Sequence, residues 1–332
     1  MDTTLAVICA LAVGAVVAAA VLALLEHRRR VETFAQHPTK LYVRPLWGVA
    51  NRFRTLNVAH DLARLLRIPL VILENDDKFW HSKLDTLCHF DGVDVVQTDG
   101  FYATTPKETY EELIFNVEGD CSRWTTVKEV RDIVATGKSV VIYACGLDVR
   151  RAAGEPDLVV TDDFYKKMRV TPAVLAKLAG VIDTIRAEPV VGVHVRQGSI
   201  TDFHNGWFFM DWHKGPDDKV PVFCCSQEPG KSLSSCTTNV APIEKFVAAM
   251  KRFPATQKFF VASDRPGCYL NLEAEFPGRI LHNRIAVEHD VDSDNAFLDW
   301  YCLSQCSKLV LSGISSYSGE AMKVRGTSAE FL

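Results

Sequence analysis

The apolar run Val190–Val195 constrains the fold of this chain more than any other stretch. It lies between Pro189 and Gly198, consists mostly of valine, and is followed at once by Arg196. Apolar residues this dense, without alternating polar positions, are typical of a parallel strand buried on both faces. Open α/β sheets bind ligands at the carboxyl ends of such strands. The run therefore predicts a buried strand that presents an arginine to a ligand site.

Arg196 and its neighbour His194 are the first candidate site residues. The planar guanidinium suits phosphate because it can donate two parallel hydrogen bonds to an oxyanion. His194 lies two residues before Arg196, so on a strand the two side chains share a face. The plainer interpretation is a strand end with a surface arginine.

Short apolar segments alternate with helical patterns over the rest of the chain. The predicted strands fall into two series, 41–44, 70–73, 93–96 and 139–145, and then 190–196, 258–263, 279–281 and 308–312. Helical spacing of apolar residues separates several of them, as at 51–67, 174–186, 243–252 and 295–305. Alternation of this kind predicts parallel sheets covered by helices. We expect two α/β domains, divided near residues 165–188, with a ligand cleft between them.

The N-terminal segment has a different composition. Leu5–Leu25 carries no charged side chain and is long enough to span about 30 Å as a helix, the thickness of a bilayer core. It predicts a single transmembrane anchor, with its basic flank, over residues 1–30. A cleaved signal peptide is the alternative, but its apolar part is usually shorter and follows a basic start. Arg28–Arg30 follow the span and favour a cytoplasmic position for the large C-terminal part of the chain.

Composition excludes several function classes. The net charge of −4 gives no sign of nucleic-acid binding. The ten cysteines form no CxxC pair, and Cys302 and Cys306 have no histidine companion at zinc-finger spacing. No P-loop, GxSxG, HExxH or GxGxxG motif is present. A loop contains Asp202, His204, Asp211 and His213, but polar residues scattered in this way are typical of a solvated loop, and we expect no metal site.

Three loops would line the predicted cleft. The first joins strand 41–44 to the next helix, where Gly48 would allow a tight turn and Asn51 is the N-cap in the plainest interpretation. The second follows Arg196. The third, 312–319, is rich in serine and leads from a strand into a helix, where backbone N–H groups and hydroxyls could hold a phosphate.

In this order the motifs resemble the fucosyltransferase superfamily, which includes the nodulation and core α1,6-fucosyltransferases and the protein O-fucosyltransferases. The matching segments are WGVANRFRTL, GVHVRQG, FFVASD and LSGISSYSGEA, spread over about residues 41–322. The resemblance implies the GT-B architecture, in which two Rossmann-like domains face a cleft. Residues 31–170 would form the acceptor-side domain and residues 171–332 the nucleotide-sugar-binding domain, after the transmembrane helix.

The resemblance also implies an activity and a site. Such enzymes transfer fucose from GDP-fucose to a glycan hydroxyl with inversion, and use neither a metal nor another cofactor. Arg196 would neutralise the diphosphate of the leaving GDP, a contact that strengthens in the transition state. The residues implied to bind the donor are Gly48, Asn51, Arg52, His194, Asp264, Ser315, Ser316 and Tyr317.

The general base stays open at this point. A carboxylate within hydrogen-bond reach of the acceptor hydroxyl would suit. Asp202 is the candidate that follows Arg196 most closely, with Asp211 and Glu74 as alternatives. Family habit in eukaryotes favours the lumen of the endoplasmic reticulum or Golgi, against the flanking charges.

Other functions also stay open. One is a GT-B transferase that uses another nucleotide sugar. Another is a glycan- or nucleotide-binding protein without activity. A hydrolase that uses the Asp/His-containing loop is the remaining alternative, and the sequence offers no geometry for it.

Overall fold

The computed structural model describes most of the chain after residue 38. Described are Val21 and residues 39–74, 80–115, 125–150, 152, 154, 158–196, 203–204, 207–208, 242–263, 266–283, 293–312 and 315–331. No helix within these ranges is long and apolar enough to cross a bilayer. Apart from Val21, the predicted anchor Leu5–Leu25 lies outside them, so the structure gives it no support.

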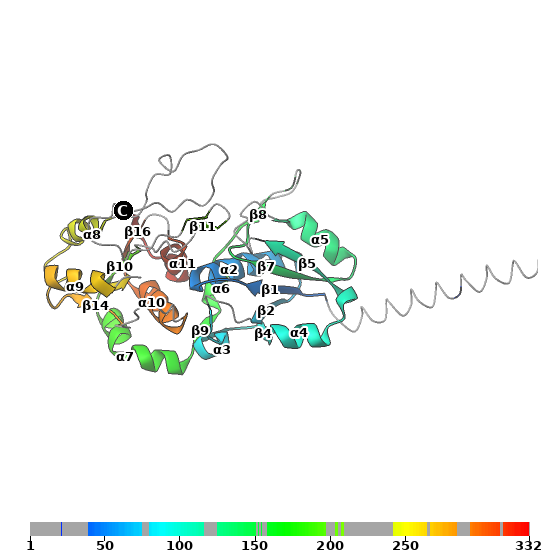
Figure 1. Cartoon of the computed structure of the whole chain (residues 1–332), viewed down its shortest axis with the longest axis horizontal. Coiled ribbons are helices and arrows are strands. Elements are labelled where there is room, and N and C mark those ends of the chain that lie inside the picture. The colour runs from blue at the N-terminus through cyan, green and yellow to red at the C-terminus, as the bar shows by residue number, and fades with distance from the viewer. Residues whose placement is uncertain are drawn as a thin grey trace, which may run out of the picture.

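The first lobe is built on a parallel five-stranded sheet in the order β4-β2-β1-β7-β5 (Figure 1). Its strands are β1 (Leu41–Pro45), β2 (Leu70–Glu74), β4 (Asp94–Gln97), β5 (Tyr110–Phe115) and β7 (Ser139–Ala144). Its helices are α2 (Val49–Leu66), α3 (Leu84–Leu87), α4 (Thr98–Thr104), η1 (Lys107–Thr109) and α5 (Val127–Ala135). Short strands β6 (Thr125–Thr126) and β8 (Val149–Arg150) pair beside it.

The second lobe repeats this plan in the order β14-β13-β10-β15-β16, again with every pair parallel. Its strands are β10 (Val191–Val195), β13 (Phe259–Ser263), β14 (Ile280–Leu281), β15 (Lys308–Leu311) and β16 (Ala329–Phe331). Its helices are α7 (Pro172–Ala187), α8 (Ile243–Met250), α9 (Pro266–Glu275), α10 (Ser293–Gln305) and α11 (Ser316–Arg325). A separate two-stranded pair joins β11 (Phe203–His204) and β12 (Trp207–Phe208). The described fold thus contains two parallel sheets with their helices, one sheet in each lobe, as the sequence predicted.

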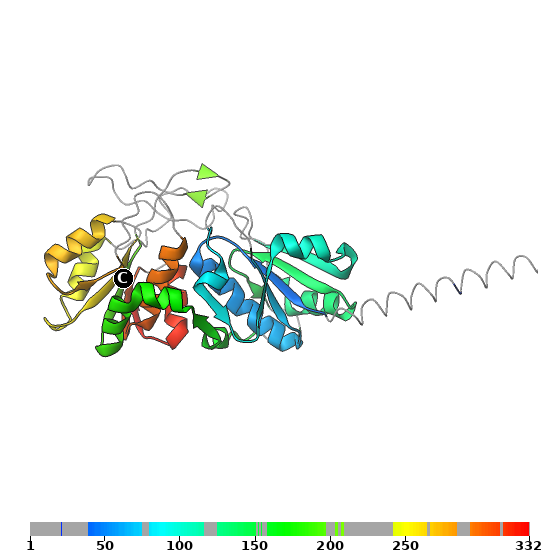
Figure 2. The ribbon, with the colours of Figure 1, turned by 90° about the horizontal axis from the view of Figure 1, so that it is seen from below.

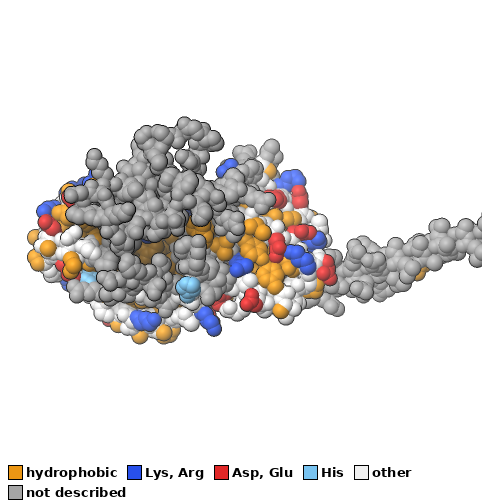
Figure 3. Space-filling view, viewed as in Figure 1, with side chains coloured by type: hydrophobic (Ala, Val, Ile, Leu, Met, Phe, Trp, Pro, Cys, Tyr) orange, Lys and Arg blue, Asp and Glu red, His pale blue; other side chains and the backbone are white. Residues whose placement is uncertain are grey.

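One connection joins the two lobes. It contains α6 (Asp163–Lys166) and β9 (Met168–Val170), and β9 pairs antiparallel with β3 (Cys88–Phe90) of the first lobe. The predicted division at residue 170 thus falls between β9 and the start of α7. The lobes lie side by side along the long axis of the molecule (Figure 2). On the face shown in Figure 3, acidic and basic side chains of the described residues are intermixed over the first lobe.

A shared aromatic core joins the lobes. Phe53 of α2 stacks on Trp300 of α10, with ring centroids 4.5 Å apart, and both side chains are fully buried. Phe297 and Tyr165 contact the same Phe53 ring at centroid distances of 5.9 and 6.5 Å. Large buried aromatic surfaces contribute strongly to packing energy. Because α2 also lies against its own sheet, the two lobes share one continuous core.

Strand β10 is central in the second sheet, and Gly192 is the residue that lets α10 approach it. A Cβ added to Gly192 would lie 2.5 Å from Leu309 Cδ2, 3.1 Å from Cys306 Sγ and 3.1 Å from Leu303 Cδ2. All three side chains are buried, so none can move into solvent. The glycine in the valine run is therefore required by close packing.

We expect Gly192→Ala to lower the free energy of unfolding by about 1–3 kcal/mol, because the added methyl overpacks a filled core. Gly180→Ala is the matched control, since Gly180 is an exposed position of helix α7 with nothing within 4 Å of a Cβ. This control should be more stable than the wild type by about 0.5–1 kcal/mol. Denaturant unfolding measures both, and equal stability of the two variants would contradict the packing argument.

Candidate active site

The carboxyl edge of the second sheet brings Arg196 close to the start of the third predicted loop. Strands β10 and β15 are neighbours there, and Ser312 joins their ends. Its hydroxyl accepts a hydrogen bond of 2.9 Å from the Arg196 N–H, while its own N–H donates to the His194 carbonyl at 3.1 Å. Ser312 therefore fixes the backbone from which Arg196 projects.

The Arg196 side chain is exposed at this edge. Its positive charge reaches the buried Tyr317 hydroxyl, where it partly offsets the effects that raise the pKa of Tyr317. Exposure is what a group needs if it is to meet a soluble anion, and the carboxyl edge is where parallel sheets bind ligands. The strand thus forms where the sequence predicted it, and the role of Arg196 in a ligand site stays a prediction.

The rings of the buried His194 and the partly buried Tyr317 form a pair near Arg196. Their ring centroids are 4.9 Å apart, and the Tyr317 hydroxyl donates to the Ala296 carbonyl at 2.5 Å. Burial raises the pKa of Tyr317 well above its ordinary value, and the negative charge of Asp299 raises it further. Tyr317 therefore stays neutral and acts as a hydrogen-bond donor. His194 is only 4% exposed, so it lies behind the surface that a ligand would contact.

The third predicted loop leads into helix α11. Ser315 is the N-cap residue, and its side chain makes no capping hydrogen bond. The N-terminal turn of a helix carries unpaired N–H groups and a partial positive charge, which suit an anion. Ser316 lies in this turn, and its hydroxyl is 3.5 Å from Asn51 Oδ1 of the first lobe. Asn51 and Ser316 are thus brought together from opposite lobes, 265 residues apart in sequence.

The first loop differs from its predicted geometry. Trp47, not Gly48, takes the left-handed conformation, with a φ of 68°. Gly48 has a φ of −70°, which any residue can adopt, and it is the N-cap of α2 in place of Asn51. The interpretations of Gly48 as the residue that permits the turn and of Asn51 as the N-cap were therefore wrong, because the strained position lies one residue earlier than glycine patterns suggest.

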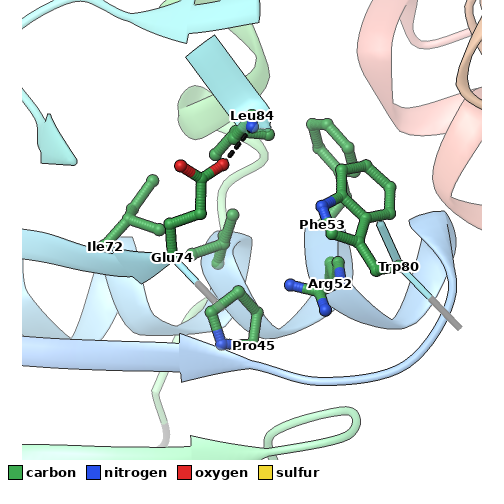
Figure 4. Close-up of a pocket in the computed structure, with 8 residues that line it drawn as sticks. Pro45, Arg52, Phe53, Ile72, Glu74, Trp80 and Leu84 are labelled. Carbon is green, nitrogen blue, oxygen red and sulfur yellow. Dashed lines mark hydrogen bonds between the residues drawn. The ribbon is translucent and has the colours of Figure 1, made fainter. Parts of the chain in front are cut away.

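Arg52 is turned into the first lobe. It is 4% exposed, its Nε donates to the Trp47 carbonyl at 2.7 Å, and its guanidinium lies 4.8 Å from the centre of a Trp80 ring (Figure 4). This arrangement holds the left-handed turn at Trp47 in place. A direct contact between Arg52 and a donor stays a prediction.

Glu74 lies in a small hollow at the carboxyl edge of the first sheet (Figure 4). The hollow has room for about one water molecule. Its lining residues are Pro45, Arg52, Phe53, Leu56, Ile72, Glu74, Trp80 and Leu84. One Glu74 oxygen accepts from the Leu84 N–H and the other from Gln97 Nε2 at 2.5 Å. Since both oxygens are engaged, Glu74 joins three segments of the first lobe.

Asp299 is an ionisable residue near Tyr317 that the sequence did not indicate. It projects from α10, and its Oδ1 accepts a hydrogen bond of 2.8 Å from Asn283, which follows strand β14. Burial raises the pKa of Asp299 to about 7, and the Asn283 hydrogen bond opposes this rise. The sequence could have pointed to Asp299, because this carboxylate lies between Leu298 and Trp300 in an apolar helical stretch.

Several predicted residues lie outside the described part of the chain. They are Asp202, Asp211, His213 and Asp264, together with the side chain of His204. Among the described residues, no group of His, Cys, Asp or Glu could hold a metal ion. The five described cysteines, Cys88, Cys145, Cys268, Cys302 and Cys306, are all buried.

Comparison with solved structures identifies the class of fold. No protein-family model matches the sequence, and no curated protein does either. Structures of fucosyltransferases do match, so the chain has the mixed α/β fold of the GT-B fucosyltransferases. The sequence identities are 13–15%, so the similarity to these structures is a similarity of fold.

Two neighbours in particular share this fold. One is POFUT1 in complex with GDP-fucose, at a TM-score of 0.53 and 15% identity, covering 88% of this chain and 98% of that chain. The other is the fucosyltransferase NodZ from Bradyrhizobium, at 0.50 and 13%, covering 85% and 93%. A NodZ α-1,6-fucosyltransferase crystal soaked with GDP-fucose matches at 0.50 and 13%, covering 86% and 93%. The expected resemblance to this superfamily is therefore confirmed at the level of fold.

The raised pKa of Asp299 predicts a pH dependence of stability. The folded-state pKa of about 7 lies above the unfolded value near 3.8, so the folded protein loses stability as pH rises between these two values. Asp299→Asn removes the charge and keeps an oxygen that can accept from Asn283. The difference in the free energy of unfolding, variant minus wild type, should therefore grow by more than about 1 kcal/mol from pH 5 to pH 8. Denaturant unfolding at both pH values measures this, and parallel pH profiles would contradict it.

Proposed function

We propose that this chain is an inverting glycosyltransferase that transfers fucose from GDP-fucose to a glycan hydroxyl. The observation that carries the proposal is the position of Arg196 beside the N-terminal turn of α11, with Ser312 bonded to the Arg196 backbone. Two groups that favour an anion thus lie at one carboxyl edge. The shared fold with fucosyltransferases crystallised with GDP-fucose supports the choice of donor.

The diphosphate of the donor would lie across this edge. The N–H groups and hydroxyls of Ser315 and Ser316 would hold its oxygens from the helix end, and the exposed Arg196 would approach from β10. Negative charge grows on the diphosphate as the glycosidic bond breaks. Fixed donors aimed at that charge stabilise the transition state more than the ground state.

His194, Tyr317 and Asn51 would act around this centre. The His194–Tyr317 pair would hold the Ser-rich loop and the end of β10 in place, because each ring comes from one of these two segments. Asn51 reaches the edge from the first lobe, at 3.5 Å from Ser316, so it would contact the donor from the opposite wall of the cleft. Arg52 would act through the Trp47 turn that places Asn51. Asp264 would contact the guanosine.

The acceptor hydroxyl must lose a proton as it attacks the anomeric carbon. We keep Asp202 as the proposed base, since it follows Arg196 closely in the chain. Glu74 is less suited because both of its oxygens already accept hydrogen bonds. The mechanism uses no metal ion, because the guanidinium and the helix N-terminus would supply the charge that the leaving GDP needs.

Membrane attachment is proposed from the sequence alone. The uncharged segment Leu5–Leu25 would anchor the chain, and the basic residues after it favour a cytoplasmic catalytic part.

A panel of nucleotides tests the donor. GDP should raise the melting temperature by at least about 2 °C at a concentration 100 times its Kd, because ligand that binds only the folded state stabilises it by about 2.7 kcal/mol. UDP at the same concentration should leave the melting temperature nearly unchanged. Stabilisation by UDP and not by GDP would replace fucose with another donor.

Replacement of Arg196 tests the chemistry. Arg196→Ala should lower fucosyl transfer by about 10²–10³-fold and change stability by less than about 0.5 kcal/mol, because the side chain is exposed. Arg196→Lys keeps the charge but loses the planar fork, so it should restore only part of the activity. Arg186→Ala, at an exposed position near the end of α7, is the matched control and should remain fully active. Transfer by Arg196→Ala at the wild-type rate would refute the assigned role.

A further inference from the structure

Helix α11 makes a buried polar contact with the segment that connects the lobes. The Tyr165 hydroxyl of α6 donates to Glu320 Oε2 at 2.5 Å. Tyr165 is 2% exposed and Glu320 is 4% exposed. The other Glu320 oxygen pairs with Lys323 Nζ at 2.8 Å, on the same helix. A buried carboxylate is tolerated because both oxygens have partners.

The same face of α11 makes two contacts, one with the first lobe and one with the connection between the lobes. Ser316 and Glu320 are four residues apart, so they lie one above the other on one side of the helix. Ser316 meets Asn51 of α2, and Glu320 meets Tyr165. A helix turn is rigid, and the Tyr165–Glu320 bond therefore also fixes the end of α11 that carries Ser316.

The Tyr165 hydroxyl is itself held relative to α2. The segment before α6 is tied down by the fully buried Asp61, which accepts from the Thr161 N–H at 2.6 Å. Asn57 Nδ2 donates to Asp162 Oδ1 at 2.7 Å, and Asp162 has a left-handed φ of 59°. Three successive residues, 161–163, thus lead directly from these contacts into α6. Tyr165 is thus held in a fixed position relative to α2 of the first lobe.

We propose that Tyr165 and Glu320 are positioning residues that set the N-terminus of α11 against Asn51. The proposed diphosphate site at the N-terminal turn of α11 is then complete only when the Tyr165–Glu320 hydrogen bond is made. The inference rests on the proposed function, since it concerns how the same site is assembled. The aromatic core around Phe53 holds the lobes together, and the Tyr165–Glu320 bond adds a polar contact on α11 itself. A single hydrogen bond with a defined donor and acceptor fixes the rotation and axial position of α11.

The protonation of the pair agrees with this role. Burial and the neighbouring Glu320 carboxylate raise the pKa of Tyr165 well above its ordinary value. The proton therefore stays on the tyrosine, and the hydroxyl donates throughout the neutral pH range.

Removal of the Tyr165 hydroxyl tests the proposal. In the full chain, Tyr165→Phe should weaken GDP binding by about five- to tenfold, measured by calorimetry, because the helix end is no longer held in register. Glu320→Ala should have a similar effect, and Glu320→Gln, which can still accept from the hydroxyl, should stay within about twofold of the wild type. Because the pair acts as one unit, the double variant Tyr165→Phe/Glu320→Ala should bind GDP no more weakly than the weaker of the two single variants.

Tyr110→Phe is the matched control. Tyr110 is buried like Tyr165, with 4% of its surface exposed. Its ring centroid lies 5.3 Å from that of Phe101, in a separate cluster of the first lobe. Removal of the Tyr110 hydroxyl should leave the affinity for GDP unchanged. A Tyr165→Phe variant that melts at a lower temperature yet binds GDP within twofold of the wild type would overturn the proposal, since the bond would then be purely structural.

Hydrogen exchange separates this inference from the proposed function. If the wild-type chain does not bind GDP, the proposed function fails, but the ligand-free amides of 315–320 still report on the helix end. They should exchange faster in Tyr165→Phe than in Tyr110→Phe. Equal exchange in the two variants would overturn the positioning role whatever the ligand.

Discussion

The stack of Phe53 on Trp300 joins two sheets that come from different halves of the chain, and the arrangement of the site depends on it. Phe53 belongs to the helix that begins directly after the first candidate loop, and Trp300 to the helix that carries Asp299. Burial of these rings removes a large apolar area from water and brings α2 against α10 and α11. The carboxyl edge of the second sheet thereby acquires a second wall, to which Asn51 belongs.

The candidate site combines rigid and exposed parts. Ser312, His194 and Tyr317 are held by short hydrogen bonds and ring contacts, while Arg196 projects into solvent from the end of a buried strand. This combination suits a site that must present fixed donors to a charged substrate, because little reorganisation is needed when charge develops. The strained turn at Trp47 and the buried Arg52 have the same effect on the opposite wall.

The fold was predicted well where a strand is a continuous apolar run, and less well at the edges of the sheets, where strands carry polar residues. Strand β10 was evident because its valines are buried on both faces. Strand β5 was missed because an edge strand with Glu111 and Glu112 lacks a continuous apolar run. Strand β16, also at an edge, was missed for the same reason. Edge strands need fewer apolar residues because one side faces no neighbouring strand.

The site was predicted in part for a related reason. Arg196 and the serine-rich loop follow strands, so their place at the carboxyl edge could be inferred from chain order alone. The turn at Trp47, the inward orientation of Arg52 and the role of Asp299 depend on three-dimensional packing. The Tyr165–Glu320 pair spans 155 residues, and no local pattern indicates that these side chains meet.

The chain passes between the two sheets of the described fold only once, through α6 and β9. Neither half made alone could cover its own aromatic rings, since each supplies the rings that bury those of the other. Proteolytic cleavage of the connection would leave two fragments that stay associated through their interlocked side chains. The shared core thus gives the two halves of the chain a means of association that does not depend on the connecting segment.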